Sequence, residues 1–193
     1  MDKRIVKTRN NIKQTLIKML AEKSFEDITV KELCEKAETS RITFYTHYSD
    51  KTELVNSIFE DMQKKALDIY HTLQSENNKT GDIVLDYLNI LDCILDIYYN
   101  NYDFFAHTRL EENPTLNYMY YKFIDEFVGY KIAQDIDRFN PRWSIGMTRD
   151  FICCGIRGFI SAGREEGLSG DEIRPLAREL LKRLLENEVL RKN

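Results

Sequence analysis

The sequence predicts an all-α protein, and three features of its 193 residues support this fold class. Apolar residues recur at helical spacing almost throughout the chain. No segment shows the sustained alternation that is typical of a half-buried strand. The first 80 residues contain neither glycine nor proline, so the strongest helix breakers are absent there. We expect about nine helices, divided between a small N-terminal domain and a larger helical domain.

The first helix is expected at residues 5–22. Its apolar stripe consists of Ile5, Ile12, Leu16, Met19 and Leu20. The first 20 residues carry six basic residues and one acidic residue, whereas the whole chain has a net charge of −4. A basic end on an acidic body is typical of nucleic-acid binding, but a solvated helix face has the same pattern.

Two short helices follow the first one. Thr29 and Glu32 have the spacing of a capping box, and apolar residues at i, i+3, i+4 and i+7 then form about two turns at residues 30–37. After a turn, a third helix is expected at residues 40–47, with its core side at Phe44 and Tyr48. Its outward face carries Arg, Ile, Thr, Tyr and Thr, whereas Glu and Lys dominate ordinary solvated surfaces.

This arrangement indicates a helix-turn-helix, in which the second helix lies in the major groove of DNA. Arg41 can donate to guanine acceptors and Ile42 can contact a thymine methyl group. Threonine hydroxyls can bond to base edges or phosphate, and the basic first helix adds non-specific attraction. The candidate DNA-contacting residues are Thr29, Ser40, Arg41, Ile42, Thr43, Tyr45, Thr46, His47 and Lys51.

Residues 37–54, AETSRITFYTHYSDKTEL, resemble the helix-turn-helix signature of the tetracycline-repressor (TetR) family of transcriptional regulators. The matching positions are Ala37, Ser40, Thr43, Phe44, Tyr45, His47, Asp50, Lys51 and Leu54. Glu38 replaces the usual glycine of the turn, and Thr39 replaces a small apolar residue. The resemblance implies an N-terminal three-helix DNA-binding domain joined to a larger helical domain that binds a ligand and dimerises through its last two helices.

The expected domains are residues 1–52 for DNA binding and residues 53–193 for ligand binding and dimerisation. A fourth helix begins after Ser49-Asp50 and connects the two domains mechanically. A polar loop is expected at residues 75–81. The larger domain then continues with helices at 82–100, 102–111, 114–137, 144–166 and 170–190.

The last two expected helices supply candidate dimer contacts. A wide apolar stripe follows the last helix, and small residues on the preceding helix would allow two helix backbones to approach closely. The candidates are Phe151, Gly155, Gly158, Phe159, Ala162, Leu180 and Leu184. Ordinary intramolecular core must account for part of this stripe. A dimer would place two recognition helices on successive turns of a palindromic DNA site.

Aromatic residues are concentrated at residues 98–130, which contain 11 of the 21 tyrosines and phenylalanines. Tyrosine combines an apolar ring with a polar group, as ligand pockets often require. The family resemblance implies an inducer pocket here, and a flat or moderately polar organic effector would suit it. The candidate lining residues are Tyr98, Tyr102, Phe105, Tyr118, Tyr121, Phe123 and Phe127. The alternative is that most of these rings are core.

The sequence therefore predicts a ligand-responsive repressor that binds a palindromic operator in double-stranded DNA as a homodimer. The alternative is a DNA-binding regulator, an activator included, that a protein partner controls. An enzyme is not expected, because the sequence has no nucleophile elbow, phosphate loop, dinucleotide glycine pattern or metal-ligand cluster. We assign no catalytic residue, cofactor or metal.

The remaining expectations concern cysteines and location. No two of the four cysteines form a CxxC pair, so we expect buried, reduced thiols, with a redox pair at Cys153 and Cys154 as the alternative. No apolar run approaches the ~18 residues of a membrane span, and the N-terminus lacks the apolar core of a secretory signal. We therefore expect a cytoplasmic protein without membrane contact.

Overall fold

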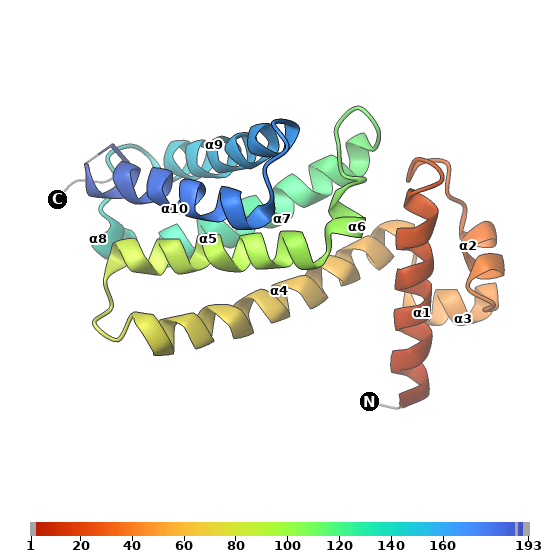
Figure 1. Ribbon diagram of the computed structural model, residues 1–193. Helices are drawn as coiled ribbons and strands as arrows, with labels where there is room; N and C mark the ends of the chain where they lie inside the picture. The colour runs from red at the N-terminus through yellow and green to blue at the C-terminus, as the bar shows by residue number, and fades with distance from the viewer. Residues whose placement is uncertain (1–2, 188, 191–193) are drawn as a thin grey trace. The chain divides into compact units, whose positions relative to one another are not determined.

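The computed structural model describes residues 3–187, 189 and 190, and this part of the chain contains helices but no strand (Figure 1). The all-α prediction is therefore confirmed. The helices are α1 (Lys3–Leu20), α2 (Val30–Lys36), α3 (Arg41–His47), α4 (Lys51–Asn77), α5 (Ile83–Asn100), α6 (Tyr102–Phe105), α7 (Pro114–Gln134), α8 (Ile136–Phe139), α9 (Ile145–Glu165) and α10 (Gly170–Glu186). Among the described residues, none of these helices combines the length and the hydropathy that a membrane span requires.

The chain forms two compact units. Unit 1 consists of Met1–Lys64 and Asn101–Tyr121, and unit 2 consists of Lys65–Asn100 and Lys122–Asn193. Helices α4 and α7 therefore each begin in unit 1 and end in unit 2. Unit 1 is therefore discontinuous in the sequence, because Lys65–Asn100 of unit 2 separates its two segments. The domain boundary expected after residue 52 stays a prediction.

Several helix ends differ from the sequence expectation. Helix α4 continues through Asn77, into the expected loop. Helix α6 ends at Phe105, because two asparagine side chains capture the carbonyls that follow: Asn113 Nδ2 donates to His107 O at 2.9 Å, and Asn117 Nδ2 donates to Thr108 O at 2.8 Å.

The helix expected at residues 114–137 is divided into α7 and α8. The described part of the chain therefore contains ten helices, where about nine were expected. Helix α10 ends at Glu186, before the expected end at residue 190, and residue 188 of that expected helix lies outside the described residues.

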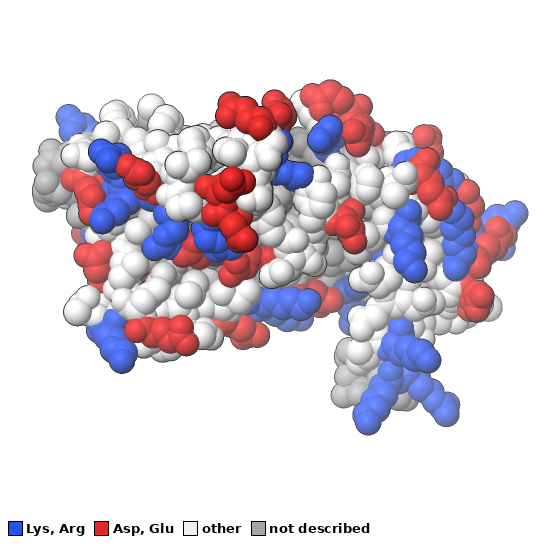
Figure 2. Space-filling model, viewed as in Figure 1, with Lys and Arg blue, Asp and Glu red and all other residues white. Residues whose placement is uncertain are grey.

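The core of unit 1 forms between the second half of α1 and the helices that follow it. Ile12 and Leu16 of α1 are fully buried, as are Leu33 of α2 and Phe44 of α3. The first half of α1 is different, since every residue from Lys3 to Lys7 is exposed. Figure 2 shows basic side chains gathered at this end of α1.

Polar side chains of α1 bind two other parts of unit 1, helix α4 and the turn between α2 and α3. Lys13 Nζ is buried, donates to the Ser57 carbonyl at 2.9 Å and pairs with Asp61 at 2.5 Å. Asn11 Nδ2 donates to the Ala37 carbonyl at 2.7 Å, in the turn between α2 and α3. These contacts join α1 to the turn between α2 and α3 and to α4, so α1 helps to hold the three helices in place.

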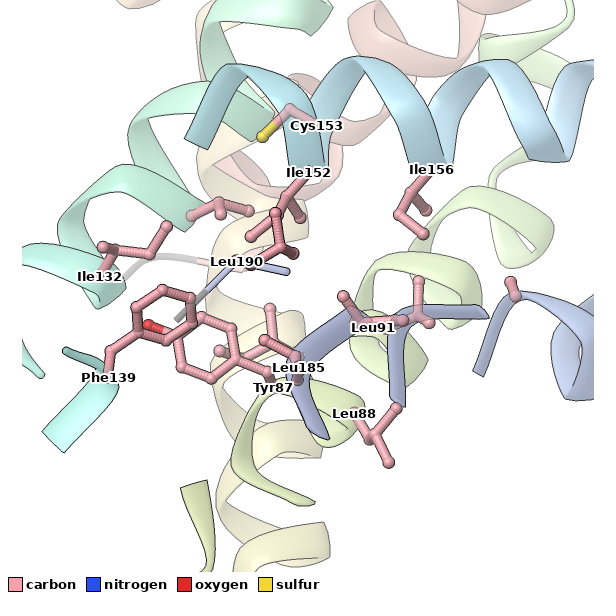
Figure 3. Close-up of a cluster of buried hydrophobic side chains, with 14 of the residues drawn as sticks. Tyr87, Leu88, Leu91, Ile132, Phe139, Ile152, Cys153, Ile156, Leu185 and Leu190 are labelled. Carbon is pink, nitrogen blue, oxygen red and sulfur yellow. The ribbon is translucent and has the colours of Figure 1, made fainter. Parts of the chain in front are cut away.

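The core of unit 2 surrounds α5 (Figure 3). Leu88 and Leu91 of α5 belong to the same buried cluster as Ile152 of α9 and Leu185 of α10. Helix α10 packs against both α5 and α9. The aromatic ring of Tyr87 lies 4.7 Å from that of Phe139, measured between centroids. Burial of this apolar surface is the main stabilising contribution to the unit.

Charged side chains also join the helices of unit 2. Asp92 of α5 is buried and accepts from Arg174 of α10 at 3.2 Å and from Arg178. Asp86 of α5 is likewise buried and pairs with Lys131 of α7 at 3.3 Å. Buried carboxylates require such partners, because removing an unpaired charge from water is costly.

Candidate nucleic-acid interface

Two helix caps define the helix-turn-helix. The Thr29 hydroxyl accepts from the backbone N–H of Glu32 at 3.2 Å at the start of α2. The Ser40 hydroxyl accepts from the backbone N–H of Thr43 at 3.0 Å at the start of α3. Both caps satisfy donors that a helix leaves unpaired in its first turn. The expected start of each helix is thus correct to within one residue.

The turn between the two helices contains a residue in the left-handed conformation. Glu38 has a φ of 50°, at the position where the family pattern has glycine. The Glu38 N–H donates to the Glu35 carbonyl at 3.2 Å, and the Thr39 N–H donates to the Cys34 carbonyl at 2.9 Å. The turn therefore has the hydrogen bonds of a helix that ends at a glycine. It holds a glutamate, however, in the left-handed conformation that glycine adopts with the least strain.

Replacing Glu38 with glycine should raise the free energy of unfolding by about 0.5–1 kcal/mol. Removing the side chain relieves the strain of a left-handed residue, and the greater freedom of glycine in the unfolded chain offsets part of this gain. Chemical denaturation measures the change. Glu35→Gly is the matched control, since it lies inside α2 and should lower stability by about 1 kcal/mol. A loss of stability in Glu38→Gly would contradict the strain.

The outward face of α3 is exposed, as the sequence predicts. Ile42 is 82% exposed and Tyr45 is 56% exposed, and Arg41 and Thr46 are also exposed. These four side chains line an open depression on the surface of α3. A large aliphatic residue exposed to this extent gains nothing from the core of its own chain. The face is therefore available to a partner.

The hydroxyl groups of α3 differ in what they can still bind. Thr46 Oγ1 donates to the Ile42 carbonyl at 2.9 Å, so its lone pairs can still accept from a base amino group. Thr43 Oγ1 lies 2.8 Å from Ser40 Oγ, and Thr43 is only half-exposed. Ser40 and Thr43 are thus occupied in the helix cap, which makes Thr46 the better candidate for base contact.

Aromatic packing fixes the orientation of α3. Phe44 is fully buried and Tyr48 is 2% exposed, as the sequence predicts. The Tyr45 ring meets the Phe44 ring edge to face, with centroids 5.4 Å apart. The half-exposed His47 ring approaches Tyr48, with centroids 6.3 Å apart. Tyr45 and His47 are therefore positioned by the core while part of each ring remains accessible.

Lys51, an expected phosphate contact, binds backbone carbonyls of its own chain. Its ammonium group donates to the backbone carbonyls of Phe25, Glu26 and Ile28 at 2.5, 2.9 and 2.9 Å, and lies 4.6 Å from the centroid of the Phe25 ring. Burial lowers the pKa of Lys51, while the carboxylates of Glu26 and Asp27 raise it. These contacts give Lys51 a positioning role, because all three of its N–H donors are used. Its phosphate contact stays a prediction.

Asn113 binds the same turn from another direction, and the sequence gives no signal for it. Its side-chain oxygen accepts from the backbone N–H of Phe25 at 2.5 Å, and its side-chain nitrogen holds the His107 carbonyl. Asn113 is 2% exposed. The turn before Thr29 is therefore held by Lys51, which follows the recognition helix, and by the residue that precedes α7.

The candidate dimer residues remain largely accessible in the single chain. Phe151 is 52% exposed, and added Cβ atoms at Gly155 and Gly158 would contact nothing. The rest of the set is exposed or half-exposed: Ala162 is exposed, and Phe159, Leu180 and Leu184 are half-exposed. By contrast, Ile173 of α10 lies within 3.1 Å of the position of a Cβ on Gly163, so part of the predicted stripe is intramolecular core.

The candidate effector residues fall into both compact units. Tyr102, Phe105, Tyr118 and Tyr121 belong to unit 1, and Tyr98, Phe123 and Phe127 belong to unit 2. Phe105 is buried and packs against Tyr120, with ring centroids 4.8 Å apart, so this ring is core. Tyr118 is 65% exposed and Tyr102 is 37% exposed, and the remaining four candidates are half-exposed: Tyr98, Tyr121, Phe123 and Phe127.

The cysteines are free thiols, and three of them are buried. Burial raises the pKa of Cys93 and of Cys153 to about 12. Cys154 is exposed, which corrects the expectation that all four are buried.

Comparisons with known proteins agree with this geometry. Residues 14–58 match the family described as bacterial regulatory proteins, tetR family. Two relatives are uncharacterized HTH-type transcriptional regulators of Bacillus subtilis (strain 168). YxbF is 31% identical over 80 residues, which are 41% of this chain and 21% of YxbF; YvdT is 29% identical over 85 residues, which are 44% of this chain and 40% of YvdT. The match therefore spans less than half the length of either relative.

Solved structures share the whole fold. A putative TetR-family transcriptional regulator from Syntrophomonas wolfei superposes with a TM-score of 0.75 at 14% identity, over 93% of this chain and 95% of that chain. A γ-butyrolactone receptor (ArpA-like protein) superposes with a TM-score of 0.53 at 14% identity, over 97% of this chain and 100% of that chain.

A capped helix with an exposed mixed face, held behind by a second short helix, defines a helix-turn-helix DNA-binding protein. The match to the family includes this motif, and the structural similarity extends over 93% of the chain. Residues 14–58 thus match the tetR family of bacterial regulatory proteins, and the described chain shares the fold of solved TetR-family regulators.

Proposed function

We propose that the chain is a repressor that binds a palindromic operator as a homodimer and is released by a small organic effector. The exposed face of α3 carries the DNA-binding part of this proposal, because Arg41, Ile42 and Thr46 offer a donor, a methyl-contacting group and an acceptor side by side. Thr29, Tyr45 and His47 would contact phosphates and set the register.

Dimerisation is supported by the accessible stripe on α9. Met147 and Phe151 are 63% and 52% exposed, and Gly155 and Gly158 continue the same helix face. An exposed apolar patch of this kind is typical of an interface, and two copies would cover it symmetrically. Two chains would also double the number of base pairs that a seven-residue recognition helix reads.

The effector would act through the two helices that run from unit 1 into unit 2. Helix α4 begins at Lys51, whose ammonium holds the turn before α2. Helix α7 begins next to Asn113, which binds the same turn. An effector that binds more tightly to a DNA-incompetent arrangement would reduce operator affinity. One structural neighbour is named as a receptor for a small lactone, so this fold can serve small-molecule recognition.

Selection of bound sequences from random duplexes should recover an inverted repeat, with half-site centres about 34–36 Å apart. The chain should elute as a dimer. Phe151→Glu should elute as a monomer, because it would place a carboxylate in the interface. Tyr130→Glu is the matched control, since Tyr130 is an aromatic residue of unit 2 that is 66% exposed on α7, outside the proposed interface. A single half-site, or an unchanged mass for Phe151→Glu, would contradict the dimer.

A further inference from the structure

Helix α5 is buried along most of its length but has polar side chains on part of its surface. Every residue from Asp86 to Cys93 is buried, and three of them carry a carboxylate or an amide: Asp86, Asn89 and Asp92. Asp92 binds arginines of α10. Asp86 and Asn89 bind side chains from the second half of α4, which runs alongside α5 in unit 2 (Figure 1).

Asn77 of α4 and Asn89 of α5 form a reciprocal amide pair. Asn77 Nδ2 donates to Asn89 Oδ1 at 3.1 Å, and Asn89 Nδ2 donates to Asn77 Oδ1 at 2.8 Å. Asn89 is 0% exposed. Because each amide supplies both a donor and an acceptor to the other, the pair closes only when the two side chains lie directly opposite each other.

Asp86 makes the second attachment between the two helices. The Tyr70 hydroxyl and Gln74 Nε2 both donate to Asp86 Oδ1, the latter at 2.7 Å. The other carboxylate oxygen lies 3.3 Å from the ammonium group of Lys131 on α7, which balances the charge. Tyr70, Gln74 and Asn77 recur at i, i+4 and i+7, so one face of α4 supplies all the bonds to α5.

Hydrogen bonds specify the position of a helix more narrowly than apolar contacts do. A donor and its acceptor must lie about 2.7–3.2 Å apart, whereas packed apolar helices can slide a little past each other. The net contribution of one hydrogen bond to stability is small, and replacing both partners by apolar groups is often nearly neutral. A displacement of α4 by ~1 Å would break its bonds to Asp86 and Asn89. These bonds therefore hold α4 at one position on α5.

Helix α4 is built to transmit this position along its length. It has 27 residues, or ~40 Å at the rise of an α-helix. Its sequence contains neither glycine nor proline, the residues at which helices usually kink. Its first residue, Lys51, binds the turn that precedes α2. A displacement of its last turns therefore reaches the helix-turn-helix.

We propose that Asp86 and Asn89 are positioning residues that restrict the dimer to operators with one separation of the half-sites. This inference rests on the homodimer and the palindromic operator proposed above. One base pair inserted between the half-sites moves them ~3.4 Å apart and rotates one against the other by ~34–36°. Helix α4 cannot follow this displacement and keep its bonds to α5, so the unchanged chain binds the altered spacing weakly.

The test is the affinity of the full chain, measured by fluorescence anisotropy, for the selected operator and for operators with one base pair inserted or removed between the half-sites. The double variant Asn77→Ala, Asn89→Leu removes both amides together, so neither is left buried without a partner. Its loss of affinity on altered spacing should be about 2- to 12-fold smaller than that of the unchanged chain, the range for one hydrogen bond. Affinity for a single half-site should not change, because the face of α3 is untouched.

Tyr70→Phe is a second variant, which keeps the ring and leaves Asp86 paired with Lys131. It should also bind the altered spacings better, and it tests the inference if the double variant does not fold. The matched control is Thr72→Ala, Ser75→Ala, because these exposed hydroxyls donate only to carbonyls of α4 itself in the bonds that they make at 3.0 and 2.8 Å. It should discriminate against altered spacing as strongly as the unchanged chain does.

Three results would overturn the inference. The first is a Tyr70→Phe variant and a folded double variant that keep the full preference for one spacing. The second is a control that loses this preference to the same extent. The third is an unchanged chain that binds an inverted repeat but accepts every spacing equally. If the unchanged chain binds no inverted repeat at all, the proposed function fails and this inference fails with it.

Discussion

Arg41→Ala should lower affinity for the selected operator about 5- to 150-fold, which corresponds to 1–3 kcal/mol, and should relax the preference at one base pair of each half-site. Arg41 is the first residue of α3 and is exposed beside Ile42 and Tyr45. Its planar fork of donors fits the two acceptors of a guanine edge. Binding to the operator and to single-base variants measures both effects.

Arg41→Lys separates charge from geometry at the same position. Lysine keeps the positive charge but cannot form the bidentate contact, so the dependence of affinity on salt should persist while the base preference disappears. Arg109→Ala is the control, because Arg109 is an exposed arginine of unit 1 whose Nη1 lies 3.9 Å from a carboxylate oxygen of Glu112. It should leave affinity unchanged. If Arg41→Ala binds every variant as the unchanged chain does, α3 is not the reading helix.

Lys51→Met should destabilise unit 1 by about 1.5–3 kcal/mol, because three backbone carbonyls lose a charged donor. The midpoint of thermal unfolding should fall by roughly 3–12 °C for a protein of this size. Operator affinity should fall as well, since the released turn leads directly into Thr29 and α2. Calorimetry and operator binding on the same samples test the two effects together.

Lys65→Met controls for the loss of a lysine from the same helix, since Lys65 is exposed on α4. It should leave the thermal midpoint unchanged. If Lys51→Met has an unchanged thermal midpoint but weaker operator binding, the result would favour the phosphate contact that the sequence suggests over the positioning role. A lowered midpoint with a weaker dependence of affinity on salt would show that Lys51 does both.

The recognition helix could be predicted almost completely from the sequence. Its caps, its buried Phe44 and its exposed Ile42 all follow from local rules, because ~100° per residue fixes which side chains share a face. The charge pattern likewise located the basic end of the chain. What charge could not show is that Arg9 donates to the Tyr48 hydroxyl and Lys13 turns inward, while Lys3, Arg4 and Lys7 stay exposed.

Helix ends were less predictable where distant side chains decide them. The polar stretch after Ser75 is typical of a loop, yet α4 continues because Gln74 and Tyr70 bind Asp86 of α5. Helix α6 ends early because Asn113 captures a carbonyl six residues before it. The helix propensity of residues 75–81 or 102–111 identifies neither Asp86 nor Asn113 as a partner.

The sequence by itself determined the helical class, the helix-turn-helix and the face that α3 presents to solvent, because helix periodicity and capping act over a few residues. The tertiary structure alone decided which atoms Lys51, Asn113 and Arg9 bind, since their partners lie 23–26, 88 and 39 residues away. Bonds over such separations depend on how the helices pack, and packing places a donor within about 3 Å of an acceptor in a way that no local pattern specifies.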